Sequence, residues 1–317
     1  MLIGFNLPIS GPMAAPDTMA RMAREGEALG FDYLTLTDHL VVPDMRTPGY
    51  PYSESGEFYS PDPGHRHEQL TAAAWIAAQT RRIRLVLAVM VVPHRPAVLA
   101  AKMLTTVDVL SGGRLVVGVG AGWLKAEFDA AVTTPFAERG AVTDEYLDAF
   151  RTLWTEKQPR LDGRYVKMDG LLFDPKPVQQ PYPPIWVGGE SGPSMRRAAR
   201  IGDAWYPIGS NNKHLLDTLP RLEAGIARLR KMTAEAGRDP ARVGVVYRVK
   251  RFAHAAPPAS DGNRRLFSGS VDQVVEDVRA LRGIGVTGLD FDFEGTDADK
   301  ALAAMRQFSD TVLPRLR

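Results

Sequence analysis

The chain has no cysteine among its 317 residues. This absence excludes disulfide bonds, thiolate catalysis and cysteine-bound metal centres together. No apolar run approaches the roughly 18 residues that a membrane span needs, so no membrane partner is expected. The amino terminus, MLIGFNLP, has the pattern of a short strand and carries no charged leader. A reducing cytoplasm is therefore the expected location.

An excess of charge of one sign is also missing. The 39 Lys and Arg residues nearly balance the 37 Asp and Glu residues, for a net charge of +2. No basic stripe with interleaved aromatic side chains occurs, so nucleic acid is not expected as a partner. No metal site is predicted, because the spacing typical of metal ligands is not found among the histidines, which stand at positions 39, 65, 67, 94, 214 and 254. No Gly-x-Ser-x-Gly motif accompanies an acid and a histidine in order, which argues against an acyl hydrolase.

A strand-helix-strand unit between residues 81 and 128 indicates the fold. The apolar run from Ile83 to Val92 is rich in β-branched residues and is stopped by Pro93. An apolar helix pattern follows from Pro96 to Leu110, and a second apolar run covers Leu115 to Val119. Neither run alternates apolar with polar residues, which is typical of parallel strands that are covered by helices on both faces.

The same junction, in which a helix ends at a glycine and a buried strand follows, recurs in ALGFDYLTL, ARIGDAWYPI and GIGVTGLDFDF. Strands are expected near 2–7, 32–36, 83–89, 114–119, 184–188, 203–207, 243–251 and 286–292. Helices are expected near 17–29, 68–80, 96–110, 137–154, 191–201, 213–236, 270–284 and 297–313. This series predicts an α/β fold, a (β/α)8 TIM barrel that residues 1–317 form as a single domain. The alternative, a doubly wound open sheet, would need a dinucleotide fingerprint, and Gly118-Val-Gly120-Ala-Gly122 lacks the G-x-G-x-x-G spacing.

Two segments are longer than ordinary connections. Residues 39–67 follow the second strand and are rich in Pro, Gly, Ser and Tyr. We expect them to fold over the barrel mouth as a lid or substrate wall. Residues 158–182 contain LDGRYVKMDGLLF, whose alternation around two glycines predicts a small hairpin insertion before the fifth strand.

Chemistry is expected at the carboxyl ends of the barrel strands. Asp38 and His39 end the second strand, where a carboxylate and an imidazole can position a cofactor ring or transfer a proton. The alternative is that Asp38 caps the long loop and that His39 is buried and hydrogen-bonded. Gly120 and Gly122 end the fourth strand and offer backbone without Cβ, which a flat ring could approach closely.

The turn after the fifth strand is a candidate phosphate seat. Gly188, Gly189 and Ser191 expose backbone at the start of a helix, and Arg196 or Arg197 follows one turn later. A simple glycine turn with a serine cap is the alternative. Glu190 speaks against a strongly anionic ligand unless its side chain points away.

Several stretches carry a resemblance to a known family. They are TDHLVVP, LVLAVMVVPHRPAVLAAKMLTTVDVLSGGRLVVGVGAGW, ERGAVTDEYLDAFRTLW with GRYVKMDG, and PKPVQQPYPPIWVGGESGPSMRRAARIGDAWYP. In content, order and spacing they resemble the luciferase-like monooxygenase superfamily, and in particular its branch of oxidoreductases that use the deazaflavin coenzyme F420. The likeness extends over nearly the whole chain and is specific for family, but much less specific for substrate.

The resemblance implies a (β/α)8 barrel, usually a homodimer, that holds a flavin or deazaflavin at its carboxyl mouth. It implies a non-prolyl cis peptide near Ala88-Val89, with Ala88, Val89 and Met90 behind the ring. Asp38 would lie near the polar edge of the ring and His39 near the reacting atom. The phosphate would lie at Gly188, Gly189 and Ser191.

One departure from the pattern of the family narrows the expected activity. The sugar-phosphate dehydrogenase branch has a carboxylate and a tryptophan where Trp123 and Pro43 stand here, so sugar-phosphate oxidation is not expected. Glu127 could replace the missing acid, although a solvated helix position is the stronger expectation for it. The leading hypothesis is hydride transfer between F420 and a small, fairly apolar organic substrate, with His39 handling a proton. The alternatives are an FMN-dependent monooxygenase and a flavin- or ligand-binding protein without turnover.

Overall fold

The computed structural model describes residues 1–43, 46–53, 55–58, 62, 64–293 and 295–316. Eight parallel strands form a closed barrel, because β10 pairs with β7 as well as with β11. The predicted (β/α)8 architecture is thus confirmed. The barrel strands are β1 (Leu2–Asn6), β2 (Tyr33–Leu36), β5 (Arg84–Leu87), β7 (Leu115–Gly120), β10 (Ile185–Gly188), β11 (Ala204–Tyr206), β12 (Gly244–Val249) and β13 (Gly288–Phe291).

The barrel interior is filled by alternate side chains of these strands. Tyr33 and Trp186 meet edge to face there, with ring centroids 5.5 Å apart. Gly4 makes room for this packing, since a Cβ on it would lie 2.2 Å from the Tyr33 ring. The opposite strand faces belong to the larger apolar core, which contains Phe5, Leu85 and many other buried side chains.

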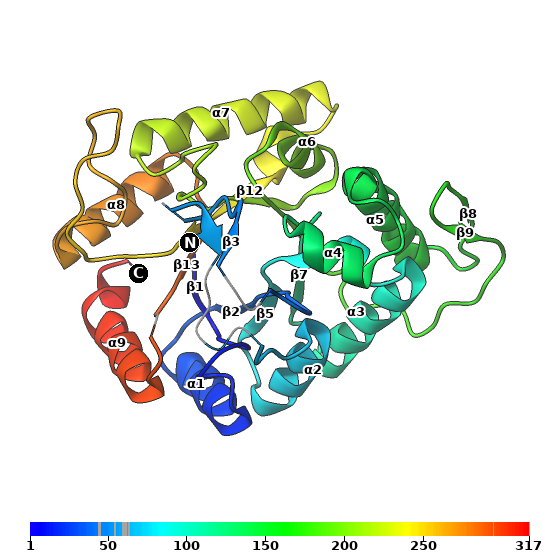
Figure 1. Cartoon of the computed structure of the whole chain (residues 1–317), viewed down its shortest axis with the longest axis horizontal. Coiled ribbons are helices and arrows are strands. Elements are labelled where there is room, and N and C mark those ends of the chain that lie inside the picture. The colour runs from blue at the N-terminus through cyan, green and yellow to red at the C-terminus, as the bar shows by residue number, and fades with distance from the viewer. Residues whose placement is uncertain (44–45, 54, 59–61, 63, 294, 317) are drawn as a thin grey trace.

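Helices surround the barrel as a ring (Figure 1). They are α1 (Pro16–Ala28), α2 (Gln69–Gln79), α3 (Ala97–Ser111), α4 (Lys125–Ala131), α5 (Arg139–Thr155), α6 (Gly192–Ile201), α7 (Leu219–Glu235), α8 (Val271–Gly283) and α9 (Ala298–Thr311). Two differ from the expectation. Helix α7 begins at Leu219 and not near residue 213, because Thr218 is its N-cap and Pro220 stands in its first turn. The short helix α4 was not expected, and it contains Glu127.

Both predicted insertions contain antiparallel pairs. In residues 158–182, β8 (Leu161–Asp162) pairs with β9 (Lys167–Met168), as the alternation there predicted. In the long segment after β2, β3 (Thr47–Pro48) pairs with β4 (Glu57–Phe58). Positions 44, 45, 54, 59–61 and 63 of this predicted lid lie outside the described residues.

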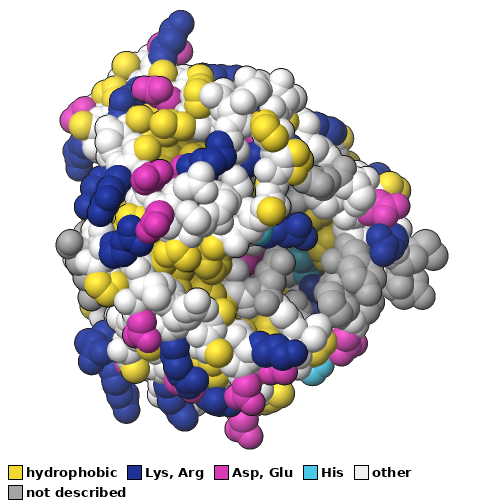
Figure 2. Space-filling view, turned by 90° about the vertical axis from the view of Figure 1, so that its left-hand side faces the viewer, with side chains coloured by type: hydrophobic (Ala, Val, Ile, Leu, Met, Phe, Trp, Pro, Cys, Tyr) yellow, Lys and Arg dark blue, Asp and Glu magenta, His cyan; other side chains and the backbone are white. Residues whose placement is uncertain are grey.

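The molecular surface over the helices carries many charged side chains of both signs. Figure 2 shows the side of the molecule that lies at the left of Figure 1, where Lys and Arg side chains are interspersed with Asp and Glu. Within the described ranges, no helix combines the length and the apolar character that crossing a membrane requires.

Candidate active site

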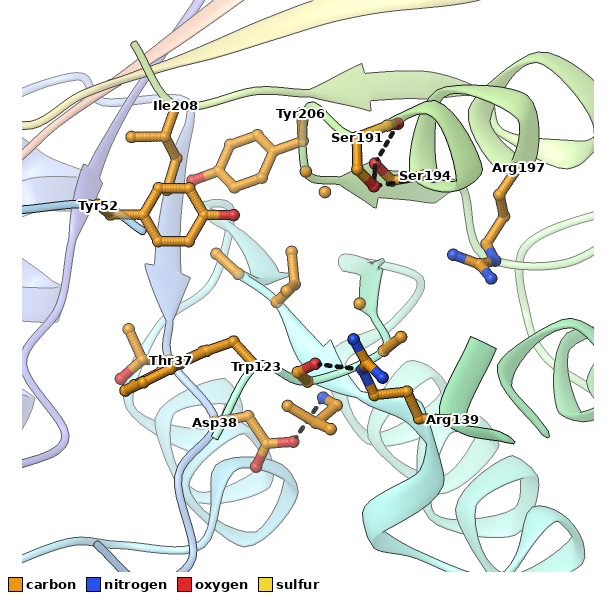
Figure 3. A pocket seen from close by; sticks show the side chains of 18 of the residues that line it. Thr37, Asp38, Tyr52, Trp123, Arg139, Ser191, Ser194, Arg197, Tyr206 and Ile208 are labelled. Carbon is orange, nitrogen blue, oxygen red and sulfur yellow. Dashed lines mark hydrogen bonds between the residues drawn. The ribbon is translucent and has the colours of Figure 1, made fainter. Parts of the chain in front are cut away.

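A pocket of about 500 Å³ opens at the carboxyl ends of the barrel strands. Its walls come from the carboxyl ends of β2, β5, β7, β10, β11 and β12 with the segments that follow them, and from the start of α5. Arg139 and Arg197 lie at one end of the pocket, and Tyr52 with Ile208 lies at the other (Figure 3). The predicted site residues on its surface are Asp38, His39, Ala88, Val89, Gly120, Gly122, Gly188, Gly189 and Ser191.

The end of β5 forms a bulge that projects Val89 into the barrel mouth. The Ala88–Val89 peptide is cis, as the resemblance implied, and the short strand β6 (Met90–Val91) follows. A Cβ on Gly120 would lie 2.7 Å from Val89, and one on Gly188 would lie 2.8 Å from it. These glycines therefore make room for the valine side chain. This contact explains the absence of a Cβ differently from the close approach of a flat ring that the sequence suggested.

Met90 does not belong to the pocket surface. Its side chain is fully buried in the large apolar core, whereas Ala88, Val89 and Val91 line the cavity. The side chains of successive strand residues point to opposite faces, so a residue between two pocket residues faces the core.

The Asp38 carboxylate is bound within the protein. Its Oδ2 accepts from the backbone N–H of Val91 at 2.8 Å and from Arg95 at 2.9 Å, and Arg95 also donates to Oδ1 at 2.9 Å. Burial lowers the pKa of Arg95, but the hydrogen bonds and charges of Asp38 and Glu68 outweigh it and raise that pKa. Asp38 thus ties the end of β2 to the bulge after β5. Its oxygens are not left for the polar edge of a ligand.

His39 is paired with a carboxylate that faces away from solvent. Its Nδ1 lies 2.8 Å from Oε2 of Glu127, while Oε1 accepts from the backbone N–H of Leu40 at 2.5 Å. The Glu127 side chain is only 2% exposed, so the expectation of a solvated glutamate was wrong. The reason is helix α4, which turns this residue inward beneath the lid segment.

The pair fixes the tautomer of His39. Burial raises the pKa of Glu127, yet the hydrogen bond from His39, the charges of His39 and His94 and the Leu40 N–H together lower it. An ionised Glu127 accepts the Nδ1 proton, so Nε2 of a neutral His39 carries the lone pair. In the described part of the chain Nε2 has no hydrogen-bond partner.

The other end of the pocket is basic. Arg197 is buried, and its Nε donates to Asp144 at 2.8 Å. Arg139 donates to the carbonyl oxygens of Gly122 and Phe136, at 3.2 and 3.0 Å, and no carboxylate of the described residues pairs with it. Ser191 is the N-cap of α6, so backbone N–H groups of that helix face this end as well.

The two arginines that the sequence proposed as alternatives are now distinguished. Arg196 is exposed and does not line the pocket, whereas Arg197, the next residue of α6, does. Gly189 has a φ of +98°, and a Cβ on it would lie 3.1 Å from the Ser194 hydroxyl. A side chain there would therefore be strained and crowded.

Glu190 points away from the basic end. Its carboxylate is buried and accepts from the Ile208 N–H at 2.7 Å and from the Asn211 side-chain amide. Burial raises its pKa to about 7, against the hydrogen bonds of Ile208, Asn211 and Tyr52. The objection that Glu190 raised against an anionic ligand is therefore removed.

The pocket floor holds a polar cluster that no motif indicated. The Tyr206 hydroxyl lies 2.9 and 3.0 Å from the two oxygens of Asp290, and Arg248 donates to Asp292 at 3.0 Å. Burial raises the pKa of Asp290 to about 6, while the charge of Arg248 opposes this. Arg248 lies near the carboxyl end of β12, and Lys250 directly follows that strand. This position at a strand end was the one sequence signal that could have identified them. Arg139 offered no comparable signal.

The fold and the pocket define an α/β-barrel protein with a cavity at its carboxyl mouth. The chain belongs to the luciferase-like monooxygenase family, whose sequence model matches residues 2–259. Members of this superfamily are oxidoreductases and monooxygenases, and some of those similar to this chain depend on F420 and others on FMNH2.

Three similar proteins illustrate this range. The FMNH(2)-dependent dimethylsulfone monooxygenase of Pseudomonas putida is 34% identical over 151 residues, which are 47% of this chain and 41% of that enzyme. The chain thus matches less than half of that relative's length. The monooxygenase RslO1 from Streptomyces bottropensis has a TM-score of 0.76 at 21% identity, with complete coverage of both chains (100% each). The coenzyme F420 dependent tetrahydromethanopterin reductase from Methanopyrus kandleri has a TM-score of 0.74 at 17% identity, covering 100% of this chain and 99% of that one. At these identities the two structures share the fold.

Proposed function

We propose that this chain is an oxidoreductase that binds the deazaflavin coenzyme F420 and transfers a hydride between it and a small organic substrate. The observation that carries the proposal is the buried Glu127 carboxylate on Nδ1 of His39, within a pocket that has a basic end. When bound, the coenzyme supplies the hydride chemistry. The protein supplies the position, the dry surroundings and the proton transfer.

His39 is proposed as the residue that moves the proton. Glu127 orients the imidazole and presents the lone pair of Nε2 to the pocket, where it would take the proton of a substrate hydroxyl or return it to a carbonyl. The negative charge of Glu127 stabilises the imidazolium that forms. This arrangement corresponds to the orienting carboxylate of other histidine bases.

The basic end of the pocket is proposed as the seat of the coenzyme phosphate. Arg139 and Arg197 supply positive charge, and Ser191 and Ser194 stand at the N-terminus of α6. Arg139 has no carboxylate partner in the described residues, so a phosphate would balance its charge. Val89, on the bulge between Gly120 and Gly188, would support the ring.

An FMNH2-dependent monooxygenase is the second candidate. It is favoured by the similarity to the dimethylsulfone monooxygenase of Pseudomonas putida. The same phosphate seat would serve either coenzyme, so the residues at this end of the pocket do not choose between them.

Titration of the purified chain with F420 and with FMN, followed by the absorbance of each ring, tests the proposal. We expect micromolar binding of F420 and loss of it in Arg139→Met. Binding of FMN alone, with an oxygen-dependent product from reduced FMN, would favour the second candidate. Binding without turnover across a broad substrate panel would support a ligand-binding protein instead.

The homodimer also remains a prediction. Four apolar side chains are exposed on α3, namely Val98, Leu99, Val109 and Leu110. Burial of such side chains between two copies would favour association. Sedimentation velocity of the native chain and of Leu110→Lys measures it directly.

A further inference from the structure

The end of the pocket opposite the arginines is lined by aromatic rings. Tyr50 from the lid segment and Trp123 from the turn after β7 meet with ring centroids 5.0 Å apart. Phe58 lies behind both, at 5.3 and 5.5 Å, and the His39 ring is 6.3 Å from Trp123. The Tyr50 and Trp123 rings are tilted by 53° to each other, so this wall presents apolar ring faces and edges beside the imidazole. An aromatic body can pack against such rings in an offset or edge-to-face arrangement.

A lysine with unmatched charge stands at the edge of this wall. Lys250 lines the pocket, and its Nζ lies 5.3 Å from the centroid of the Tyr50 ring. None of the described carboxylates comes within 4.0 Å of it. The neighbouring Arg248 differs, because Asp292 at 3.0 Å and Asp290 at 3.8 Å balance its charge.

The contacts that Lys250 does make are weak. Its Nζ lies 3.5 Å from the Tyr50 hydroxyl oxygen and 3.4 Å from the carbonyl oxygen of Tyr52. Both distances are at the outer limit for a hydrogen bond. An anionic oxygen could replace them with a shorter, charge-assisted bond, and the Tyr50 hydroxyl could donate its proton to the same group.

We propose that this half of the pocket, the ring wall of Tyr50 and Trp123 with Lys250 at its edge, binds a small aromatic carboxylate. The aromatic body lies against the wall, the carboxylate pairs with Lys250, and the side of the ring away from the carboxylate faces His39. That this ligand is the substrate rests on the proposed function. The binding itself does not, because it needs neither coenzyme nor turnover.

The test compares benzoate with its neutral isostere benzamide on the full-length chain without coenzyme, by tryptophan fluorescence and calorimetry. Saturating inorganic phosphate is present in every titration, to occupy the proposed phosphate seat at the basic end of the pocket. We expect benzoate to bind about tenfold more tightly than benzamide, the size expected for one charge-assisted hydrogen bond in a partly open site. Lys250→Met should abolish this preference and leave benzamide affinity unchanged, whereas Lys250→Arg should retain it.

Lys213→Met is the matched control. Lys213 is exposed and does not line the pocket, so its loss changes the net charge equally without touching the site. Equal affinity for the two ligands in the native chain overturns the inference. A preference that survives in Lys250→Met also overturns it, once circular dichroism shows that this variant is folded. A clear preference in a chain that binds neither F420 nor FMN supports the carboxylate site and refutes the proposed function.

Discussion

Replacement of Glu127 by glutamine should reverse the hydrogen-bonding character of His39 at the pocket. Oε1 of Glu127 accepts from the N–H groups of Leu40 and Val41, at 2.5 and 3.3 Å. The oxygen of a glutamine must stay on these donors, since its amide group would clash with them. The amide N–H would then face Nδ1 of His39. For a hydrogen bond to form, Nδ1 must be unprotonated and accept from this N–H. Nε2 would become the protonated nitrogen and lose its lone pair.

The magnitude follows from what the carboxylate does. General-base catalysis contributes about 10²- to 10⁴-fold, so the turnover of Glu127→Gln should fall by about that factor, with coenzyme affinity nearly unchanged. The loss of charge from three hydrogen bonds should cost about 2 kcal/mol of unfolding free energy. For a chain of this size that is a fall of several degrees in Tm.

Turnover, coenzyme titration and thermal unfolding measure these quantities. Long-range ¹H–¹⁵N NMR of the His39 ring reports the tautomer without any substrate. Asp129→Asn is the matched control, because Asp129 is an exposed acid on the same helix. Native turnover in Glu127→Gln, or a proton that stays on Nδ1 of its His39 ring, would contradict this role of Glu127.

Three further outcomes are expected. Burial raises the pKa of Glu190 from 4.5 to about 7, so the stability that its protonated form contributes is fully present below pH 4.5 and is lost as the pH rises through about 7. Glu190→Gln should therefore flatten the fall in Tm between about pH 4.5 and 7. Gly120→Ala places a Cβ 2.7 Å from Val89 and should lower the unfolding free energy by about 1–3 kcal/mol, measured by urea denaturation. Gly283→Ala is its control, because no atom lies within 4 Å of the added Cβ, and it should be neutral or slightly stabilising. Arg197→Met should weaken inorganic phosphate binding by about tenfold in calorimetry, and Arg196→Met should not.

The sequence predicted those features that depend on local pattern. Apolar runs without alternation, several of them preceded by a helix that ends at glycine, are sufficient to place eight parallel strands, and the barrel follows from their number. The hairpin of β8 and β9 was likewise visible in a short alternation. Position at a strand end was enough to propose His39 and Gly189, both of which line the pocket.

Features that depend on contacts between distant segments were not visible. Glu127 looks like a solvated acid until α4 places it against His39, 88 positions earlier in the chain. Arg196 and Arg197 are adjacent residues of the same type, so the sequence does not distinguish them. Only the direction in which each side chain leaves α6 decides that Arg197 is buried at the pocket. Asp38 kept its predicted place, but its carboxylate is bound by Arg95, which no spacing rule connects with it.

The glycines near Val89 show how a local sequence pattern differs from a contact between distant segments. Gly118, Gly120 and Gly188 each lack a side chain because a single bulge occupies the space: a Cβ would lie 1.8 Å from the Leu87 oxygen at Gly118, and 2.7 and 2.8 Å from Val89 at the other two. In the sequence they suggested two separate ligand turns. Because β5, β7 and β10 must meet at this bulge, the barrel sets the position of Val89 before any ligand arrives. A bulky residue at any one of the three glycine positions should therefore disturb the bulge itself.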